Sequence, residues 1–221
     1  MMNQYRYTHV IWDWNGTLLD DAWLCVAVMN GMLRERDLPT RTLRQYKEVF
    51  DFPVRDYYEK LGYDFSSEPF EEVGLEFMVL YNRRQHEARL HKGVIDILSW
   101  LRDRGIRQSI LSAREQSELI DEISAAGISP FFDHIYGLED HYAHGKTEVG
   151  FRLINDIHVP KDQILFIGDT KHDAEVAREV GIDCLLMPNG HHSRKRLELT
   201  GIPIVKQFED LKERLYRRQP D

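Results

Sequence analysis

Val10-Ile11-Trp12-Asp13-Trp14-Asn15-Gly16-Thr17-Leu18-Leu19 is the stretch from which the fold can be inferred, because an apolar segment runs straight into a carboxylate, a turn and a hydroxyl. In open α/β sheets, ligands bind beyond the carboxyl ends of the strands, so Asp13 would stand at the mouth of a site if this strand is central. Asn15-Gly16 between two apolar runs is also a strong signal for a β-hairpin. The stretch alone leaves both interpretations open.

The size and composition of the chain indicate a globular protein. Its 221 residues suffice for one large core, or for a core and a smaller domain. A content of 42% hydrophobic and 30% charged residues is typical of globular rather than disordered proteins. The formal net charge is −8 and the sequence has no clustered basic surface, so we expect no nucleic acid partner. A small anionic substrate would need local cations or a metal ion to offset this charge.

The cysteines and the apolar stretches bear on the compartment. Cys25 and Cys184 lie far apart in apolar contexts, so we expect two small core residues rather than a disulfide or a zinc site. Residues 1–8 are polar, and the longest apolar stretch, residues 23–33, is interrupted by an asparagine and a glycine. We therefore expect neither export nor a membrane partner, and a cytoplasmic location.

From residue 93 onward, helical patterns alternate with β-rich segments. Gly-Ile pairs at 105–106, 127–128 and 181–182 follow helical patterns, where glycine can supply the left-handed cap and isoleucine opens the next strand or its approach. The patterns predict helices at residues 95–104, 116–126, 149–157 and 174–180. They predict strands at residues 106–111, 135–137, 163–167 and 184–187. Such alternation indicates an α/β fold with a parallel sheet covered on both faces.

Residues 20–90 differ from the rest, with long amphipathic segments and almost no strand signal. Apolar residues recur at helical spacing in four segments, at residues 21–36, 43–51, 54–61 and 69–89. We expect these residues to form a helical insert, whose larger apolar side chains build its own core rather than contact a ligand: Trp23, Met29, Tyr57, Phe77 and Tyr81. The charged end of the chain, residues 213–221, is predicted to be a frayed helix.

Further polar residues lie at two strand ends and before one helix. Ser112 follows the predicted strand at 106–111, Gly168-Asp169-Thr170-Lys171-His172-Asp173 follows the strand at 163–167, and Lys146 precedes a helix. Asp169 could be a simple turn residue and Asp173 a helix cap. Together with Asp13, however, they are spaced to converge on one hard cation, and Mg²⁺ prefers such oxygen ligands.

The four motifs resemble those of the haloacid dehalogenase-like (HAD) hydrolase superfamily in order and approximate spacing: Asp13-Trp14-Asn15-Gly16-Thr17, Ser112, Lys146 and Gly168–Asp173. The insert resembles the C1 cap of the phosphoglycolate phosphatase-like branch. The resemblance implies a Rossmann-like parallel sheet core, residues 1–19 and 91–221, with an all-helical C1 cap inserted at residues 20–90. It also implies an enzyme, a Mg²⁺-dependent phosphatase acting on a small phosphorylated metabolite, as a monomer or a homodimer.

The resemblance also assigns roles around the phosphoryl group. Asp13 would be the nucleophile that attacks phosphorus and becomes an aspartyl phosphate, which divides one difficult displacement into two. Thr17 and Ser112 would hold phosphoryl oxygens through their hydroxyls. Lys146 would neutralise charge on Asp13 and on the phosphoryl group.

A magnesium site follows from the same resemblance. Asp13, Asp169 and the backbone carbonyl of Asn15 would bind Mg²⁺, and Asp173 would support the metal directly or through water. The cation would neutralise further charge on the phosphoryl group, so that catalysis consists of positioning and charge neutralisation.

Asn15 departs from the phosphatase pattern, in which this position carries a second aspartate as general acid and base. An amide can neither protonate a leaving alkoxide nor activate water, and such assistance is worth roughly 10² to 10⁴ in rate. The chain is therefore expected to act slowly on ordinary esters, and to be less impaired on acyl phosphates, whose leaving groups need no proton.

Three alternatives share this departure. The first is a catalytically weak phosphoryl-binding or regulatory protein. The second is a metal-independent 2-haloacid dehalogenase, against which the intact acidic motif at Asp169 argues. The third is a phosphonatase with a Schiff-base lysine, for which Lys47 and Lys60 are available but lie in charged, solvated helical contexts.

Candidate substrate contacts are Arg55, Arg114 and His172. Arg55 could reach from the insert to a substrate carboxylate, and the other two lie close to motif residues in the sequence. The remaining histidines of interest lie in loops, where we expect them to be solvated and the acidic oxygen cluster to be the better metal site: His141, His144, His191 and His192.

Overall fold

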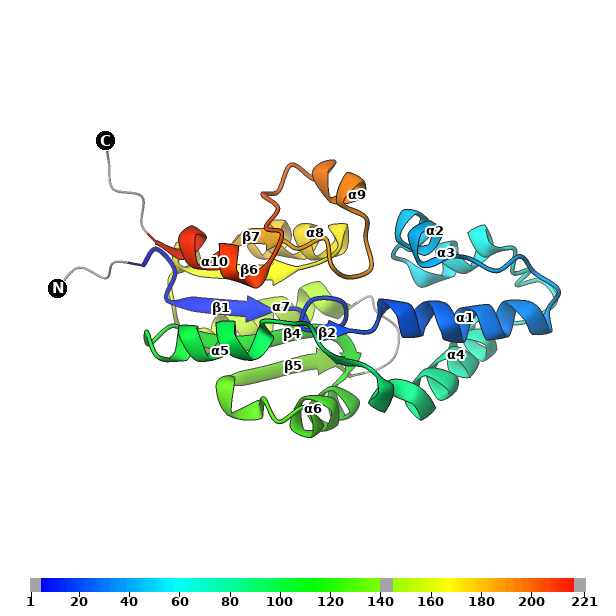
Figure 1. The fold of residues 1–221 in the computed structure, drawn as a ribbon, viewed down its shortest axis with the longest axis horizontal. Helices are drawn as coiled ribbons and strands as arrows, with labels where there is room; N and C mark the ends of the chain where they lie inside the picture. The colour runs from blue at the N-terminus through cyan, green and yellow to red at the C-terminus, as the bar shows by residue number, and fades with distance from the viewer. Residues whose placement is uncertain (1–4, 140–144, 217–221) are drawn as a thin grey trace.

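The computed structural model describes residues 5–139 and 145–216, and a five-stranded parallel sheet lies at its centre (Figure 1). The strand order is β5-β4-β1-β6-β7, and each neighbouring pair is parallel. The strands are β1 His9–Trp12, β4 Arg107–Glu115, β5 His134–Leu138, β6 Ile164–Gly168 and β7 Asp183–Leu186. The predicted α/β class and the central position of the first strand are confirmed.

Helices cover both faces of this sheet, which is why its strands are apolar on both sides. Val10 and Trp12 of β1 pack in one core with α5 (Val94–Arg102), α6 (Gln116–Ala125) and α10 (Phe208–Leu215). Ile11 points to the opposite face and packs with α7 (Lys146–Ile157), α8 (Lys171–Val180) and α9 (Arg194–Glu198). This alternation along β1 buries all four of its residues.

The remaining helices form a separate group at one end of the molecule, which we call the helical lobe (Figure 1). They are α1 Ala22–Glu35, α2 Leu43–Val49, α3 Val54–Leu61 and α4 Phe70–Arg84. The chain enters the lobe through β2 (Leu19–Asp20) and leaves it through β3 (Arg89–Leu90), and these two short strands pair antiparallel. The segment between these two strands is therefore mainly helical, and the β2–β3 pair was not predicted.

The turn after β1 is not a β-hairpin. Because β1 pairs with β4 and β6 in parallel, the apolar residues after Asn15-Gly16 do not fold back along it. Instead, the carbonyl of Trp14 accepts hydrogen bonds from the N–H groups of Thr17, Leu18 and Leu19. Gly16 adopts a φ of +79°, which favours glycine, and the turn leads directly into β2.

Several element boundaries differ from the sequence-based expectation. The strand predicted at residues 106–111 continues to Glu115 through a register shift. The helix predicted at residues 213–221 is α10, Phe208–Leu215, and residues 217–221 lie outside the described part of the chain. Trp23 was expected in the core but is 37% exposed.

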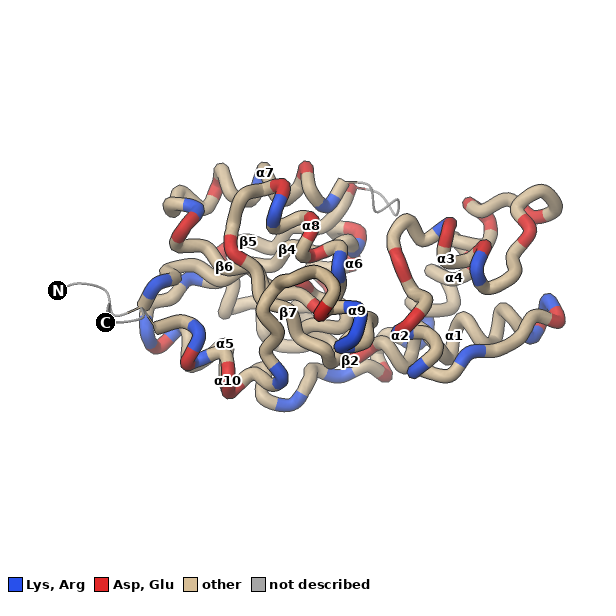
Figure 2. The backbone as a smooth tube through the Cα atoms, turned by 90° about the horizontal axis from the view of Figure 1, so that it is seen from above, with Lys and Arg blue, Asp and Glu red and all other residues tan. Residues whose placement is uncertain are grey.

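Figure 2 shows basic and acidic residues interspersed along the described backbone, without a continuous basic stripe in that view. Among the described residues, no helix combines the length and apolar character needed to cross a bilayer.

Candidate active site

The carboxyl end of the sheet brings the predicted site residues together. Asp13 follows β1, Asp169 follows β6, and Ser112 lies in the last part of β4, so their side chains meet at one edge of the sheet. Lys146, the first residue of α7, joins them from the adjacent helix. All four are buried, with at most 6% of their surface exposed.

Lys146 is the central cation of this cluster. Its Nζ atom lies 2.6 Å from Oδ1 of Asp13 and 2.6 Å from Oδ1 of Asp173. Burial alone would lower the pKa of Lys146, but the two carboxylates raise it above its ordinary value, so the amine stays protonated. The lysine therefore holds both carboxylates in fixed positions.

Two hydroxyl groups flank Asp13. Oγ1 of Thr17 lies 3.0 Å from Oδ2 of Asp13 and 3.0 Å from Oδ1 of Asp169. Oγ of Ser112 accepts a 3.0 Å hydrogen bond from the backbone N–H of Arg114. Because the oxygen is the acceptor, this hydrogen bond does not use the hydroxyl proton of Ser112. Ser112 lines the same cavity as Asp13.

Three carboxylates, those of Asp13, Asp169 and Asp173, form a buried group suited to a hard cation. One oxygen from each lies within 4.8 Å of the others. Burial and mutual repulsion raise the pKa of Asp13 to about 6 and that of Asp169 to about 8. An all-oxygen donor set with excess negative charge fits a divalent cation such as Mg²⁺.

Asp173 has a double role at the start of α8. Its Oδ2 atom accepts a 2.9 Å hydrogen bond from the N–H of Thr170, and Oγ1 of Thr170 in turn accepts one from the N–H of Asp173, so the pair forms a capping box. Despite burial, Lys146 and Thr170 lower the pKa of Asp173 to about 2. The helix-cap interpretation is therefore confirmed, and the same carboxylate also contacts Lys146.

Two glycines allow the loops around Asp169 to approach one another. A Cβ atom on Gly16 would lie 2.5 Å from Cδ2 of His191 and 2.6 Å from Oδ2 of Asp169. A Cβ atom on Gly190 would lie 2.0 Å from the same oxygen. The loop after β7 therefore closes against the first motif only because both positions lack side chains.

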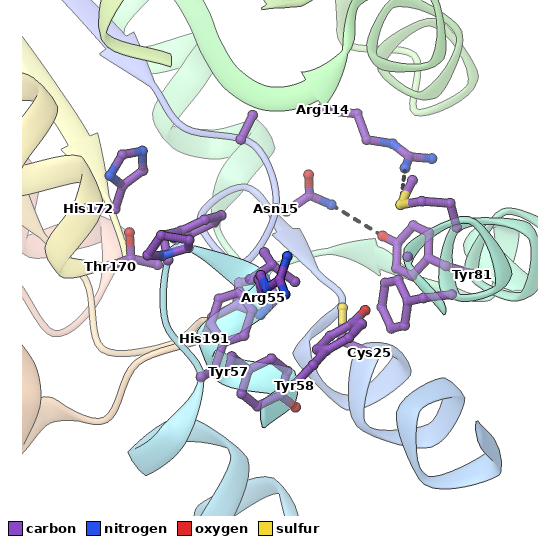
Figure 3. A pocket seen from close by; sticks show the side chains of 18 of the residues that line it. Asn15, Cys25, Arg55, Tyr57, Tyr58, Tyr81, Arg114, Thr170, His172 and His191 are labelled. Atoms are coloured by element: carbon purple, nitrogen blue, oxygen red, sulfur yellow. Dashed lines mark hydrogen bonds between the residues drawn. The ribbon is translucent and has the colours of Figure 1, made fainter. Parts of the chain in front are cut away.

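The amide of Asn15 is tied to the entrance of the helical lobe. Its Nδ2 atom donates hydrogen bonds of 2.9 Å to Oδ2 of Asp21 and 3.2 Å to the hydroxyl of Tyr81, the second of which is drawn in Figure 3. Oδ1 of Asp21 accepts a further 2.9 Å bond from the N–H of Gly16. Asn15 thus links the loop of Asp13 to α1 and α4.

A cavity of about 740 Å³ lies between the helical lobe and the sheet. Figure 3 shows Tyr57, Tyr58 and Tyr81 projecting from the helices of the lobe, with Thr170 and His172 on the other side. Tyr57, Tyr81, Met29 and Phe77 were expected only to form the core of the insert, yet all four line this cavity. The sequence could not distinguish a buried aromatic residue from one at a cavity wall.

Comparison with known proteins agrees with this geometry. The family model for haloacid dehalogenase-like hydrolases matches residues 10–187, which is more than half of the chain. The chain belongs to this family. The resemblance noted from the four motifs is thereby confirmed, and the protein is a HAD-like hydrolase.

Individual relatives of this HAD-like hydrolase carry related names. A phosphoglycolate phosphatase of Pseudomonas syringae pv. tomato is 26% identical and aligns over 91% of this chain and 77% of its own length. A phosphoglycolate phosphatase of Rhodobacter capsulatus is 24% identical and aligns over 91% of this chain and 92% of its own length. A solved structure of a HAD-like family protein from Streptococcus pneumoniae superposes with a TM-score of 0.81 at 22% identity, covering 95% of this chain and 98% of that one.

Arg114, a predicted substrate contact of the HAD-like hydrolase, is held by protein groups. Its Nε atom donates a 2.8 Å hydrogen bond to Glu122, and Nη1 lies 3.2 Å from Glu118. Nη2 donates to Asn82 at 2.5 Å and to Gln85 at 3.0 Å, both at the end of the lobe. The guanidinium group therefore joins α6 to α4.

The other two predicted contacts line the cavity. Arg55 is exposed, and its Nε atom lies 3.4 Å from Glu59 in the next turn of α3. The ring of His172 packs against Phe52 with their centroids 4.9 Å apart, and burial lowers the pKa of His172. Both remain candidate contacts.

His191 is the main site residue that the sequence analysis missed. The expectation of solvated loop histidines is wrong for His191 and His192, which are both buried, while His141 and His144 lie outside the described residues. The N–H of His191 donates to Oδ2 of Asp169 at 2.5 Å, and its Nε2 lies 3.3 Å from Asp21. Despite burial, Asp21 raises the pKa of His191 to about 9.

Proposed function

We propose that this HAD-like hydrolase is a phosphatase that transfers a phosphoryl group from a small phosphorylated substrate to Asp13 and then to water. The observation that carries the proposal is the 2.6 Å contact between Lys146 and Asp13 inside a buried group of three carboxylates. The name phosphoglycolate phosphatase of the relatives from Pseudomonas and Rhodobacter supports the same reaction class.

Asp13 acts as nucleophile in this reaction. A carboxylate oxygen of Asp13 attacks phosphorus, and the bond between phosphorus and the alcohol oxygen breaks, leaving an aspartyl phosphate. The alcohol leaves as an alkoxide, which takes a proton from solvent. Water then attacks that phosphorus and gives up a proton to solvent, and the bond between phosphorus and the Asp13 oxygen breaks, so that inorganic phosphate is released and the carboxylate is restored. Lys146 keeps Asp13 ionised, and the hydroxyls of Thr17 and Ser112 bind the phosphoryl oxygens as their charge develops.

The three carboxylates favour a divalent cation, for which we propose Mg²⁺. Asp13, Asp169 and the backbone carbonyl of Asn15 would hold it, and Asp173 would support it directly or through water. The bound cation supplies positive charge that lowers repulsion between the phosphoryl group and the carboxylates.

The helical lobe acts as a C1 cap, with residues 20–90 as the cap and residues 1–19 and 91–221 as the core. Contacts between the two support a closed arrangement: Asp51 lies 2.8 Å from Lys171 and 3.0 Å from Arg196, and Nζ of Lys47 donates to the carbonyl of Asn189 at 3.2 Å. Closure excludes bulk solvent from the site, apart from the water that attacks the aspartyl phosphate. Lys47 thus contacts the core, which argues against a role for it as the Schiff-base lysine of a phosphonatase.

One observation favours a second candidate, a catalytically weak phosphoryl-binding protein. Asn15 cannot act as acid or base, and its amide is already bonded to Asp21 and Tyr81. The intact cluster of Asp13, Lys146 and Asp169 argues for turnover, and argues against a metal-independent dehalogenase. Acyl phosphates and esters with acidic leaving groups are the substrates for which the missing acid matters least.

The test is phosphate release from acetyl phosphate, 4-nitrophenyl phosphate and ethyl phosphate, with Mg²⁺ or with EDTA, and halide release from 2-chloropropionate. We expect Mg²⁺-dependent turnover that Asp13→Asn reduces by at least about 10³-fold, with ethyl phosphate the slowest. Asp162→Asn, a change of an exposed carboxylate outside the site, is the matched control. Phosphate binding without turnover by the wild type would support the binding protein, and halide release without metal would support the dehalogenase.

A further inference from the structure

The wall of the cavity that faces the phosphoryl site is aromatic. Phe50, Tyr57, Tyr58 and Phe77 all come from the helical lobe and line the cavity. Their rings form a continuous series, with centroids 5.2 Å apart for Phe50 and Tyr57, 5.5 Å for Tyr57 and Tyr58, and 6.5 Å for Tyr58 and Phe77. An alcohol group attached to the phosphoryl oxygen would extend toward this wall.

The charges around the cavity disfavour a substrate carboxylate. Glu71, Glu72 and Glu175 line it and are exposed. Outside the phosphoryl site, the arginines that line it in the described part of the chain are Arg114, which Glu118 and Glu122 hold, and Arg55, which is exposed beside Glu59. In the described part of the chain, each of these two arginines has an acidic neighbour, with which a substrate carboxylate would have to compete.

The histidines do not change this balance. His191 directs Nδ1 to the hydroxyl of Tyr46 at 2.8 Å and Nε2 to Asp21 at 3.3 Å, so both ring nitrogens are engaged. The ring of His172 packs against Phe52 with their centroids 4.9 Å apart, and its Nδ1 atom lies 3.6 Å from the carboxylate of Glu175. Neither ring offers an uncompensated positive charge to a second anionic group.

We propose that the substrate is a phosphate monoester whose alcohol carries an aromatic or bulky aliphatic group, which packs against Tyr58 and Phe77. The proposal rests on the phosphatase function proposed above and names the substrate class of that site. A cavity of about 740 Å³ is within the range of sites that enclose such molecules, whereas a two-carbon alcohol such as glycolate fills little of it. The chain then differs in specificity from its relatives named phosphoglycolate phosphatase.

Three esters isolate the contribution of the cavity: ethyl phosphate, 2-phenylethyl phosphate and phosphoglycolate. All three release alkoxides, so the missing acid at Asn15 slows each of them. Because each buried methylene favours binding by about fourfold, we expect kcat/KM for 2-phenylethyl phosphate to exceed that for ethyl phosphate by at least about tenfold, mainly through KM. Phosphoglycolate should be no better than ethyl phosphate. A tenfold preference for phosphoglycolate, or equal values for all three, overturns the proposal.

Phe77→Ala tests the wall itself. We expect it to reduce the ratio of kcat/KM for 2-phenylethyl over ethyl phosphate by at least fivefold, because it removes one ring from the series. Val79→Ala, on the exposed face of the same helix, should leave the ratio unchanged. Thermal unfolding shows whether Phe77→Ala is folded. If the folded variant leaves the ratio unaltered, the substrate's aromatic or aliphatic group does not pack against Phe77. Phe77→Leu, which keeps an apolar side chain, should retain more of the ratio.

Binding of two non-hydrolysable phosphonates separates this proposal from the phosphatase function. If no phosphate is hydrolysed but 2-phenylethylphosphonate binds at least tenfold more tightly than ethylphosphonate, the phosphatase function fails and the ligand class holds. If acetyl phosphate is hydrolysed through Asp13 and the two phosphonates bind equally, the ligand class fails and the phosphatase function holds.

Discussion

The side-chain amide of Asn15 shares a carboxylate with a neighbouring tyrosine. Both the amide, at 2.9 Å, and the hydroxyl of Tyr81, at 2.8 Å, donate to Oδ2 of Asp21. An asparagine satisfies this arrangement because it supplies a donor where an aspartate would supply only acceptors. The residue that removes the general acid therefore also stabilises the entrance to the helical lobe.

Asn15→Asp would set two carboxyl groups side by side. Like charges at this distance raise the pKa of one partner, which leaves a protonated carboxyl near the leaving group at neutral pH. We expect kcat for ethyl phosphate to rise by up to roughly 10², with little change for acetyl phosphate. The measurement is kcat against pH for both substrates.

Asn15→Ser is the control, because it removes the amide without adding a carboxyl group. It should lower thermal stability without the gain for ethyl phosphate. An equal gain for both substrates in Asn15→Asp, or none for the ester in a folded variant, would contradict a role for this position in proton transfer.

Single residues also mark the limit of what the sequence could predict. Asp13, Ser112 and Asp169 were predicted as site residues because each directly follows an apolar segment predicted to be a strand. His191 lies in a loop beyond β7 and contacts Asp169 only through the tertiary structure. Nothing local distinguishes it from a solvated histidine.

At the scale of elements, the residues after α2 join the helical lobe to α8 and α9. Asp51 contacts Lys171 of α8 and Arg196 of α9, and the carbonyls of Lys47 and Phe50 also accept hydrogen bonds from Arg196. Burial alone would raise the pKa of Asp51, but the lysine and the arginine lower it below its ordinary value. These contacts favour the closed position of the lobe.

Asp51→Asn should weaken that closed position. We expect KM for a phosphate ester to rise roughly fivefold, about 1 kcal/mol, because partly exposed ion pairs contribute about that much. The global unfolding temperature should change little. Glu198→Gln, which removes an exposed pair with Arg194 on α9, is the matched control. A KM that is unchanged in Asp51→Asn, or raised equally in both variants, would show that these contacts do not hold the helical lobe in its closed position.

The elements themselves were largely predictable, and the exceptions have physical reasons. The helices and parallel strands carry long periodic patterns or buried apolar runs, which survive in any context. The strands β2 and β3 have two residues each and pair across the whole length of the lobe, so no local pattern could indicate them. The helix α7 starts at Lys146, three residues before the predicted start, and its first residue contacts two carboxylates that are distant in the sequence.

For the whole molecule, the balance of buried charge links stability to pH. Burial and repulsion raise the pKa of Asp13 to about 6 and that of Asp169 to about 8, from an ordinary value of 3.8. A carboxyl group whose pKa rises on folding stabilises the folded state below its unfolded pKa, and this stabilisation is lost as the pH rises through the folded pKa. In the metal-free protein, the stabilisation that these two carboxyl groups contribute should therefore be lost between about pH 4 and pH 8.

Mg²⁺ should reverse that loss. We expect Mg²⁺ to raise the unfolding temperature more at pH 8 than at pH 5, because the carboxylates that bind it are ionised only at the higher pH. Differential scanning fluorimetry with Mg²⁺ or EDTA measures both shifts. Asp169→Asn should abolish the effect, whereas Asp162→Asn should not. An equal shift at the two pH values would argue against a metal site built on Asp13 and Asp169.

The two glycines that pack against Asp169 belong to a part of the molecule that does not tolerate substitution, whereas the aromatic wall belongs to a part that does. A methyl group at Gly16 or Gly190 would displace the same carboxylate oxygen, whatever the substrate. The aromatic wall, in the substrate class proposed above, would contact only the variable portion of an ester. Laboratory selection for new substrates should therefore accumulate substitutions in the helical lobe while both glycines stay fixed, so that specificity evolves without rebuilding the chemistry.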